Sequence, residues 1–172
     1  MSITLIVLLR IIHILAGVFW AGAAFMVAAF LEPNARALGP DGGKFMQRLV
    51  GQMHMTTIIL VAAFLNVLAG VWLYWIFSGG FQVKWIASGR GLSLTIGAVA
   101  AIVTFILGLA VTRPTLLRMG TLGQEIQSAG GPPKPEQMAA MQALQKRLAT
   151  VGRIGAALLV IAVIGMAVAR YI

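Results

Sequence analysis

The sequence predicts an all-α integral membrane protein, a four-helix bundle whose third and fourth helices extend beyond the bilayer as a cytoplasmic hairpin. The chain has 172 residues, of which 60% are hydrophobic and only 10% are charged, and its mean hydropathy is +0.95. Soluble domains carry about 25% charged residues. Here the apolar residues stand in long blocks, and a helix needs about 20 of them to cross a bilayer core.

One membrane domain is expected to include the whole chain, residues 1–172. The first apolar block is longer than the core of a signal peptide, about 7–15 residues, and no small-residue cleavage site follows it, so we expect a retained helix. The predicted spans are about 3–31, 54–78, 91–112 and 151–171.

Breakers and aromatic residues delimit these spans. The first span is expected to end where prolines and glycines gather, at Pro33, Gly39, Pro40, Gly42 and Gly43. The second span ends in an aromatic group typical of a membrane interface, formed by Trp72, Tyr74, Trp75 and, further on, Trp85.

The third span is predicted to continue past Pro114, with a kink there. A turn at "SAGGPPKP" follows, and apolar residues then recur at helical spacings of three and four. The fourth helix is therefore expected to be about 37 residues and about 55 Å long, at 1.5 Å per residue, which exceeds the bilayer core. The hairpin comprises residues 113–150 approximately.

The basic residues predict an orientation, because cytoplasmic loops carry an excess of Lys and Arg. Nine of them lie on the side of the first loop and the hairpin: Arg36, Lys44, Arg48, Arg113, Arg118, Lys134, Lys146, Arg147 and Arg153. Four lie on the other side: Arg10, Lys84, Arg90 and Arg170. We expect a bacterial inner membrane protein with both termini outside. The net charge of +9 then reflects the anionic inner leaflet rather than nucleic acid, for which no basic stripe with interleaved aromatics is present.

Ionisable residues inside the first span are its most informative feature. Arg10, His13, Gly17 and Trp20 follow one another at spacings of three and four, on one face of a helix. In one interpretation Arg10 extends towards the outer surface and His13 bonds a hydroxyl or carbonyl of a neighbouring helix. In the other, His13 ligates haem b, Arg10 pairs with a propionate, Gly17 admits the macrocycle and Trp20 packs on it.

The remaining ligand candidates are few. The chain has no cysteine, which excludes thiolate sites, and no carboxylate pair or Ser–His–Asp set is present. His54 is expected about 20 Å from His13 in depth, at 1.5 Å per residue, so the two cannot clamp one iron. His54 is a weaker candidate for a second haem.

The residues expected at the depth of His13 are Asn66, Gly70, Ser93, Thr95, Gly97, Gly165 and Met166. Of these, Met166 is a candidate sixth ligand and Asn66 is expected to form an interhelical hydrogen bond. Met53, His54 and Met55 suggest a copper site, because thioether and imidazole groups are copper ligands. Adjacent side chains on a helix point in different directions, however, so these three cannot readily bind one ion together.

The stretch "LLRIIHILAGVFWAG" resembles the first helix of small bacterial membrane proteins in the copper-resistance D (CopD) group, and of the HemJ-type protoporphyrinogen oxidases. "VLAGVWLYW" resembles their second helix and "VIGMAVARYI" the closing helix of uncharacterised members. The resemblance implies haem b bound through His13. The HemJ-type Pro-Arg-Leu phrase is absent, since "LEPNAR" stands later, and the third helix has no lysine, so the resemblance does not extend to protoporphyrinogen oxidation.

These observations lead to three hypotheses. The first is a membrane protein that binds haem b near the outer face, through His13 and Arg10, and acts in electron transfer or membrane redox chemistry. The second is a non-catalytic accessory subunit of a larger membrane complex, or a homo-oligomer, that docks through its small-residue faces. The third is a copper-handling membrane protein.

Overall fold

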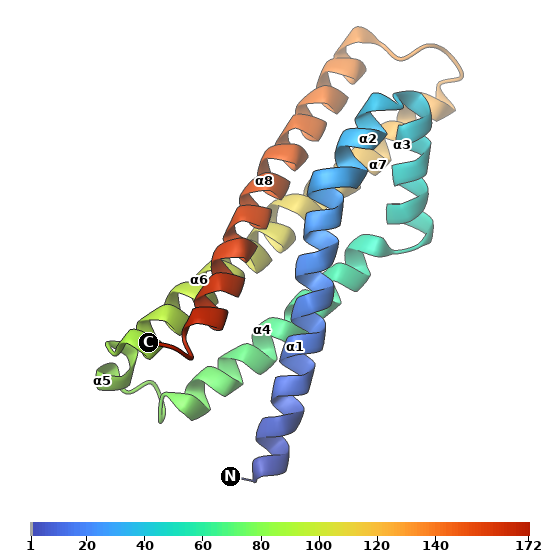
Figure 1. Cartoon of the computed structure of the whole chain (residues 1–172). Coiled ribbons are helices and arrows are strands. Elements are labelled where there is room, and N and C mark those ends of the chain that lie inside the picture. Colours follow the sequence, from blue (N-terminus) through green and yellow to red (C-terminus); the bar gives the residue numbers. More distant parts are fainter. Residues whose placement is uncertain (1) are drawn as a thin grey trace.

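The computed structural model describes residues 2–39 and 41–172, which form helices and no strand. Within this part of the chain, four helical stretches are long and apolar enough to cross a membrane: 3–37, 55–77, 89–128 and 135–168. The prediction of a four-span, all-helical membrane protein is confirmed at this level. Both termini lie at one end of the molecule, and the turn between the last two long helices lies at the other (Figure 1).

The first helical stretch continues through Pro33, so the predicted break there is wrong. α1 (Ile3–Met26) begins at Ser2, whose hydroxyl accepts a hydrogen bond from the Leu5 amide. It passes into a π-helical turn, η1 (Val27–Leu31), and then into α2 (Glu32–Ala37). Proline lacks an N–H and its ring clashes with the carbonyl four residues earlier. The wider π-turn directly before Pro33 gives the ring room, and the helix goes on.

The first loop is helical rather than irregular. α2 ends at Ala37, and Gly39, two residues later, has a φ of 57°, a conformation that favours glycine. α3 (Pro40–Gln47) and η2 (Arg48–Gln52) follow, and α3 returns alongside α2 (Figure 1). Gly42 allows α3 to approach α2 closely, because a Cβ at this position would overlap with the Ala35 carbonyl oxygen. The expected helix breaker Pro40 lies outside the described residues.

α4 (Met55–Phe77) forms the second span, and a short helix, α5 (Val83–Ile86), leads to the third. α6 (Gly89–Leu107) begins at Ser88, whose hydroxyl accepts from the Gly91 amide over 3.1 Å. As in the first span, a π-turn, η3 (Gly108–Thr112), precedes a proline, Pro114, and α7 (Arg113–Ser128) continues the helix. α8 (Pro135–Val168) is a single helix of 34 residues.

The four long helices pack as two pairs, α1 with α4 and α6 with α8. The pairs meet around Trp20, which is 5% exposed and is surrounded by small or apolar side chains of the other three helices: Ala63, Ala100, Ala101, Leu159 and Ala162. Small residues let helix backbones approach closely in lipid. Most of the apolar surface outside this core faces outwards, since at most 22% of any apolar span is buried. Contact with a lipid bilayer accounts for that surface.

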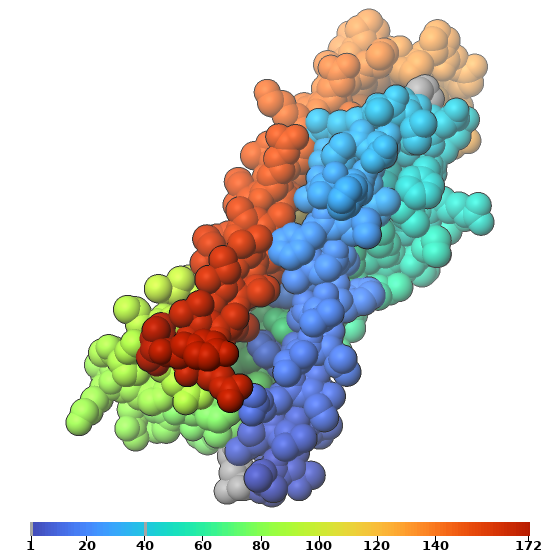
Figure 2. Space-filling model, in the orientation of Figure 1, coloured from blue at the N-terminus to red at the C-terminus, as the bar shows by residue number. Residues whose placement is uncertain are grey.

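Towards the end that carries the termini, α1 and α8 diverge (Figure 1) and the surface between them is hollowed (Figure 2). His13 precedes Trp20 by seven residues, so it lies on the same face of α1, two turns closer to this end. The fold therefore places His13 on the face of α1 that contacts α4, where its Nδ1 lies 2.8 Å from the Asn66 carbonyl oxygen.

Candidate functional site at His13

Three polar contacts, two of them short hydrogen bonds, join His13 on α1 to Asn66 on α4. His13 Nδ1 lies 2.8 Å from the backbone carbonyl oxygen of Asn66. In return, Asn66 Nδ2 donates to the backbone carbonyl oxygen of His13 over 2.7 Å. Asn66 is buried and His13 is partly buried. The interhelical hydrogen bond expected of Asn66 is thus present, and its partner is the histidine singled out in the sequence.

The short contact with the Asn66 carbonyl favours the tautomer of His13 with the proton on Nδ1, although Asn66 Nδ2 also lies 3.3 Å from that nitrogen. A carbonyl oxygen only accepts, so the 2.8 Å contact requires that Nδ1–H donates to Asn66. In a neutral imidazole, Nε2 then carries the free lone pair. Nε2 has no hydrogen-bond partner in the part of the chain that the structure describes. The one fully buried side-chain polar atom without a hydrogen bond there is Glu32 Oε1, which instead forms an ion pair with Arg36. Since Nε2 is not such an atom, it reaches the molecular surface.

Two glycines let these side chains approach the opposite helix. A Cβ on Gly70 would lie 2.8 Å from His13 Cε1 and 3.0 Å from Nδ1. Gly70 is one turn beyond Asn66, so its missing side chain is what opens the Asn66 carbonyl to the imidazole. On the other side, a Cβ on Gly17 would lie 2.6 Å from Asn66 Nδ2. The backbone of Gly17 is therefore covered by the Asn66 amide.

Arg10 and Trp20, the other members of the predicted stripe, have different surroundings. Arg10 is exposed and forms no hydrogen bond or ion pair with the described residues. It lies one turn from His13 towards the N-terminal end, at the edge of the apolar cluster of Leu9, Ala69 and Leu73. Trp20 is in the four-helix core. The stripe thus runs from an exposed cation, through a half-buried imidazole, to a buried indole.

The two further ligand candidates, His54 and Met166, belong to other segments of the chain. His54 is the exposed residue directly before α4, with a left-handed φ of 51°. It precedes Asn66 by twelve residues, about 18 Å along the helix at 1.5 Å per residue. Met166 lies at the contact of α8 with α6, where its backbone nitrogen would be 3.6 Å from a Cβ on Gly97.

Other polar side chains expected at this depth also bond between or within helices. Tyr74 Oη and Thr95 Oγ1 lie 2.6 Å apart, and the Thr95 hydroxyl lies 2.7 Å from the Gly91 carbonyl oxygen. The Ser93 hydroxyl donates to the Gly165 carbonyl over 2.7 Å. The predicted role of Tyr74 at the interface did not include this bond. Tyr74 was expected in the interfacial aromatic group and Thr95 at the depth of His13, so no sequence pattern pointed to this bond.

Within the described residues, no group of three or more His, Asp or Glu side chains is close enough to hold a metal ion. A single imidazole is sufficient for one axial position of haem iron. An imidazole with Nδ1–H on a carbonyl and Nε2 free has the arrangement typical of a metal-ligating histidine. His13 is therefore suited to be one axial ligand of haem iron. The described residues around it do not supply the three or more side chains that would bind a metal ion without haem.

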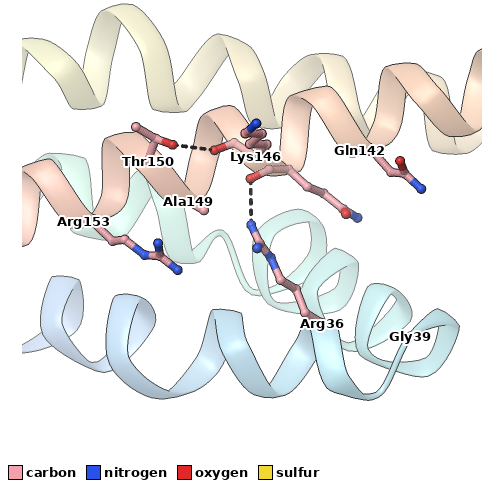
Figure 3. A pocket seen from close by; sticks show the side chains of 8 residues that line it. Arg36, Gly39, Gln142, Lys146, Ala149, Thr150 and Arg153 are labelled. Atoms are coloured by element: carbon pink, nitrogen blue, oxygen red, sulfur yellow. Dashed lines mark hydrogen bonds between the residues drawn. The ribbon is translucent and has the colours of Figure 1, made fainter.

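Three basic residues that the sequence suggested only as markers of orientation gather in the structure. Arg36 on α2 lies opposite Lys146 and Arg153 on α8, along an open groove (Figure 3). No sequence spacing joins them, because Arg36 and Lys146 are 110 positions apart.

Comparison with known proteins gives no assignment, since no family model, curated protein or solved structure matches the chain.

Proposed function

We propose that this integral membrane protein binds haem b through His13 Nε2 and acts in electron transfer or other membrane redox chemistry. The observation that carries the proposal is the hydrogen bond from His13 Nδ1–H to the Asn66 carbonyl. Such a bond fixes the tautomer and the ring orientation of a metal-ligating histidine. The resemblance of the first helix to the CopD group and the HemJ-type proteins supports the same assignment.

Each residue of the site has a role in this proposal. Asn66 orients the imidazole, and Gly70 gives it room. Gly17 admits the Asn66 amide, which holds the two helices in register. Arg10 is an exposed cation one turn away and pairs with a propionate. When bound, haem supplies one-electron redox chemistry, which no side chain of this site provides.

His54 does not share this iron, because α4 separates it from Asn66 by twelve residues. Met166 remains the candidate for the sixth position, as the hypothesis from sequence has it. The distribution of basic residues favours a bacterial inner membrane with both termini outside and the α7–α8 hairpin in the cytoplasm. The haem would then lie near the outer face.

An absorption spectrum tests the proposal. Purified protein from haem-replete cells should show a Soret band that shifts on reduction with dithionite. His13→Ala should abolish the band, and His54→Ala, which removes the other imidazole, should retain it. Both variants are first compared with the parent by size-exclusion chromatography, so that loss of haem is separated from loss of fold. A colourless parent protein that elutes as one folded species contradicts haem binding.

A second function, a non-catalytic subunit of a larger membrane complex, follows if the same contact serves packing alone. His13 Nδ1 and the Asn66 amide bond to one another within the chain, so they can join α1 to α4 without any ligand. This alternative predicts that the tagged chain co-purifies from mild detergent with other membrane proteins in a fixed ratio. A chain recovered alone, and carrying haem, contradicts it.

A further inference from the structure

The groove between α2 and α8 has the composition of an anion site. It has a volume of about 650 Å³ and is lined on one side by Arg36 and on the other by Lys146, Thr150 and Arg153. Figure 3 shows the side chains of Arg36 and Arg153 directed into the space between the two helices. No acidic side chain lines the groove.

One of the three cations is held in place by its own chain. Arg36 Nη2 lies 2.7 Å from Glu32 Oε1 and also donates to the Gln145 backbone carbonyl over 3.2 Å. Because the two contacts fix the Arg36 guanidinium between α2 and α8, its remaining N–H groups need little reordering to meet an anion.

The other two cations are not neutralised within the chain. The ion pairs of the described residues are Arg36 with Glu32 and Lys44 with Asp41. Lys146 and Arg153 take part in neither. After the Arg36–Glu32 pair is counted as neutral, the groove keeps two positive charges.

The depth of the groove indicates which anion it meets. Arg36 follows the apolar run of the first span, and Arg153 directly precedes the apolar run of the last, which begins at Ile154. Both arginines therefore lie where hydrocarbon gives way to water, the level of the lipid phosphates.

We propose that this groove binds the phosphodiester headgroup of an anionic phospholipid. Lys146 and Arg153 supply the charge, and Arg36 supplies a pre-oriented donor on the opposite wall. The bound lipid links α2 to α8, which the Arg36–Gln145 hydrogen bond otherwise joins. The proposal does not depend on haem binding.

Native mass spectrometry of the full-length protein, delipidated in mild detergent, tests this assignment. Phosphatidylglycerol and phosphatidylcholine are titrated separately, and inorganic phosphate is added in a third series. The test variant is Lys146→Gln with Arg153→Gln. The matched control is Arg147→Gln with Arg118→Gln, which removes the same charge from the α7–α8 face of the hairpin, where both residues line a different groove.

We expect phosphatidylglycerol to bind more tightly than phosphatidylcholine. The test pair should weaken phosphatidylglycerol binding about 30-fold, the loss that corresponds to two basic side chains near a membrane surface, and the control pair should weaken it much less. Arg153→Lys should keep most of the affinity. Equal weakening by the two pairs would overturn the site, and equal affinity for the two lipids would overturn its charge selectivity. Inorganic phosphate that displaces phosphatidylglycerol at equal concentration would overturn the assignment to a lipid.

Discussion

Replacement of Gly17 by alanine tests the contact that positions His13. In the structure a Cβ at this position would lie 2.6 Å from Asn66 Nδ2, whereas ordinary van der Waals contact begins at 3.4 Å. The Asn66 amide must therefore move by about 0.8 Å. Its hydrogen bond to the His13 carbonyl is 2.7 Å long, so a shift of that size away from α1 takes it to the limit of hydrogen bonding.

The magnitude follows from the two opposing effects. Alanine is a better helix former than glycine by about 1 kcal/mol. Overpacking of a well-packed contact costs about 1–3 kcal/mol, and an interhelical hydrogen bond in a membrane contributes about 0.6 kcal/mol on average. Gly22→Ala on the same helix separates these terms, because nothing lies within 4 Å of a Cβ there. We expect Gly17→Ala to be about 1–3 kcal/mol less stable than Gly22→Ala.

The assay is reversible unfolding of the purified protein in mixed micelles, followed by circular dichroism as the fraction of SDS is raised. Gly22→Ala should unfold at the same SDS fraction as the parent or later, and Gly17→Ala clearly earlier. If Gly17→Ala is as stable as Gly22→Ala, the close approach of Asn66 to α1 is refuted, and with it the argument that His13 is held by α4.

The same unfolding assay checks two other contacts. Gly165→Ala places a Cβ 2.9 Å from a backbone carbonyl oxygen of α6 and should destabilise the protein by about 1–3 kcal/mol. Gly152→Ala is the control, because nothing lies within 4 Å of a Cβ there, and it should not destabilise the protein. Equal stability of the two variants would contradict the close approach of α6 and α8. Tyr74→Phe removes the 2.6 Å bond to Thr95 and should cost about 0.6–1 kcal/mol, whereas Tyr171→Phe changes a side chain that is 82% exposed and should leave stability unchanged.

Hydropathy predicted the four spans because the physical requirement it measures, about 20 apolar residues to cross a bilayer, is local in sequence. The error at Pro33 is also physical. A proline kinks or breaks a helix because its ring clashes with the preceding turn, and here a π-turn, η1 or η3, precedes Pro33 or Pro114 and the helix continues. Whether a helix widens or stops there depends on tertiary packing, which no local pattern reports.

The site was predictable in part. Helical spacing placed His13 on one face with Gly17, and counting along the spans placed Asn66 and Gly70 at the same depth. Which side chain lies against each glycine was not predictable: Gly17 contacts Asn66, and Gly70 contacts His13. These contacts depend on how far α1 is rotated about its axis relative to α4. The basic groove was not predictable either, because Arg36 and Arg153 line one groove only in the folded chain, where Arg36 also donates to the Gln145 carbonyl of α8.

A histidine is a costly way to join two membrane helices. The α6–α8 contact of this chain uses a serine hydroxyl on a backbone carbonyl for the same purpose, and the next turns of the α1–α4 contact use Leu9, Ala69 and Leu73 without any polar group. An imidazole adds what a hydroxyl lacks, a second nitrogen with a free lone pair. Polar residues inside membranes mark function where a cheaper residue would serve for packing. Because Nδ1 is occupied by Asn66 and Nε2 has no partner among the described residues, the haem that we propose would be bound from the side of Nε2.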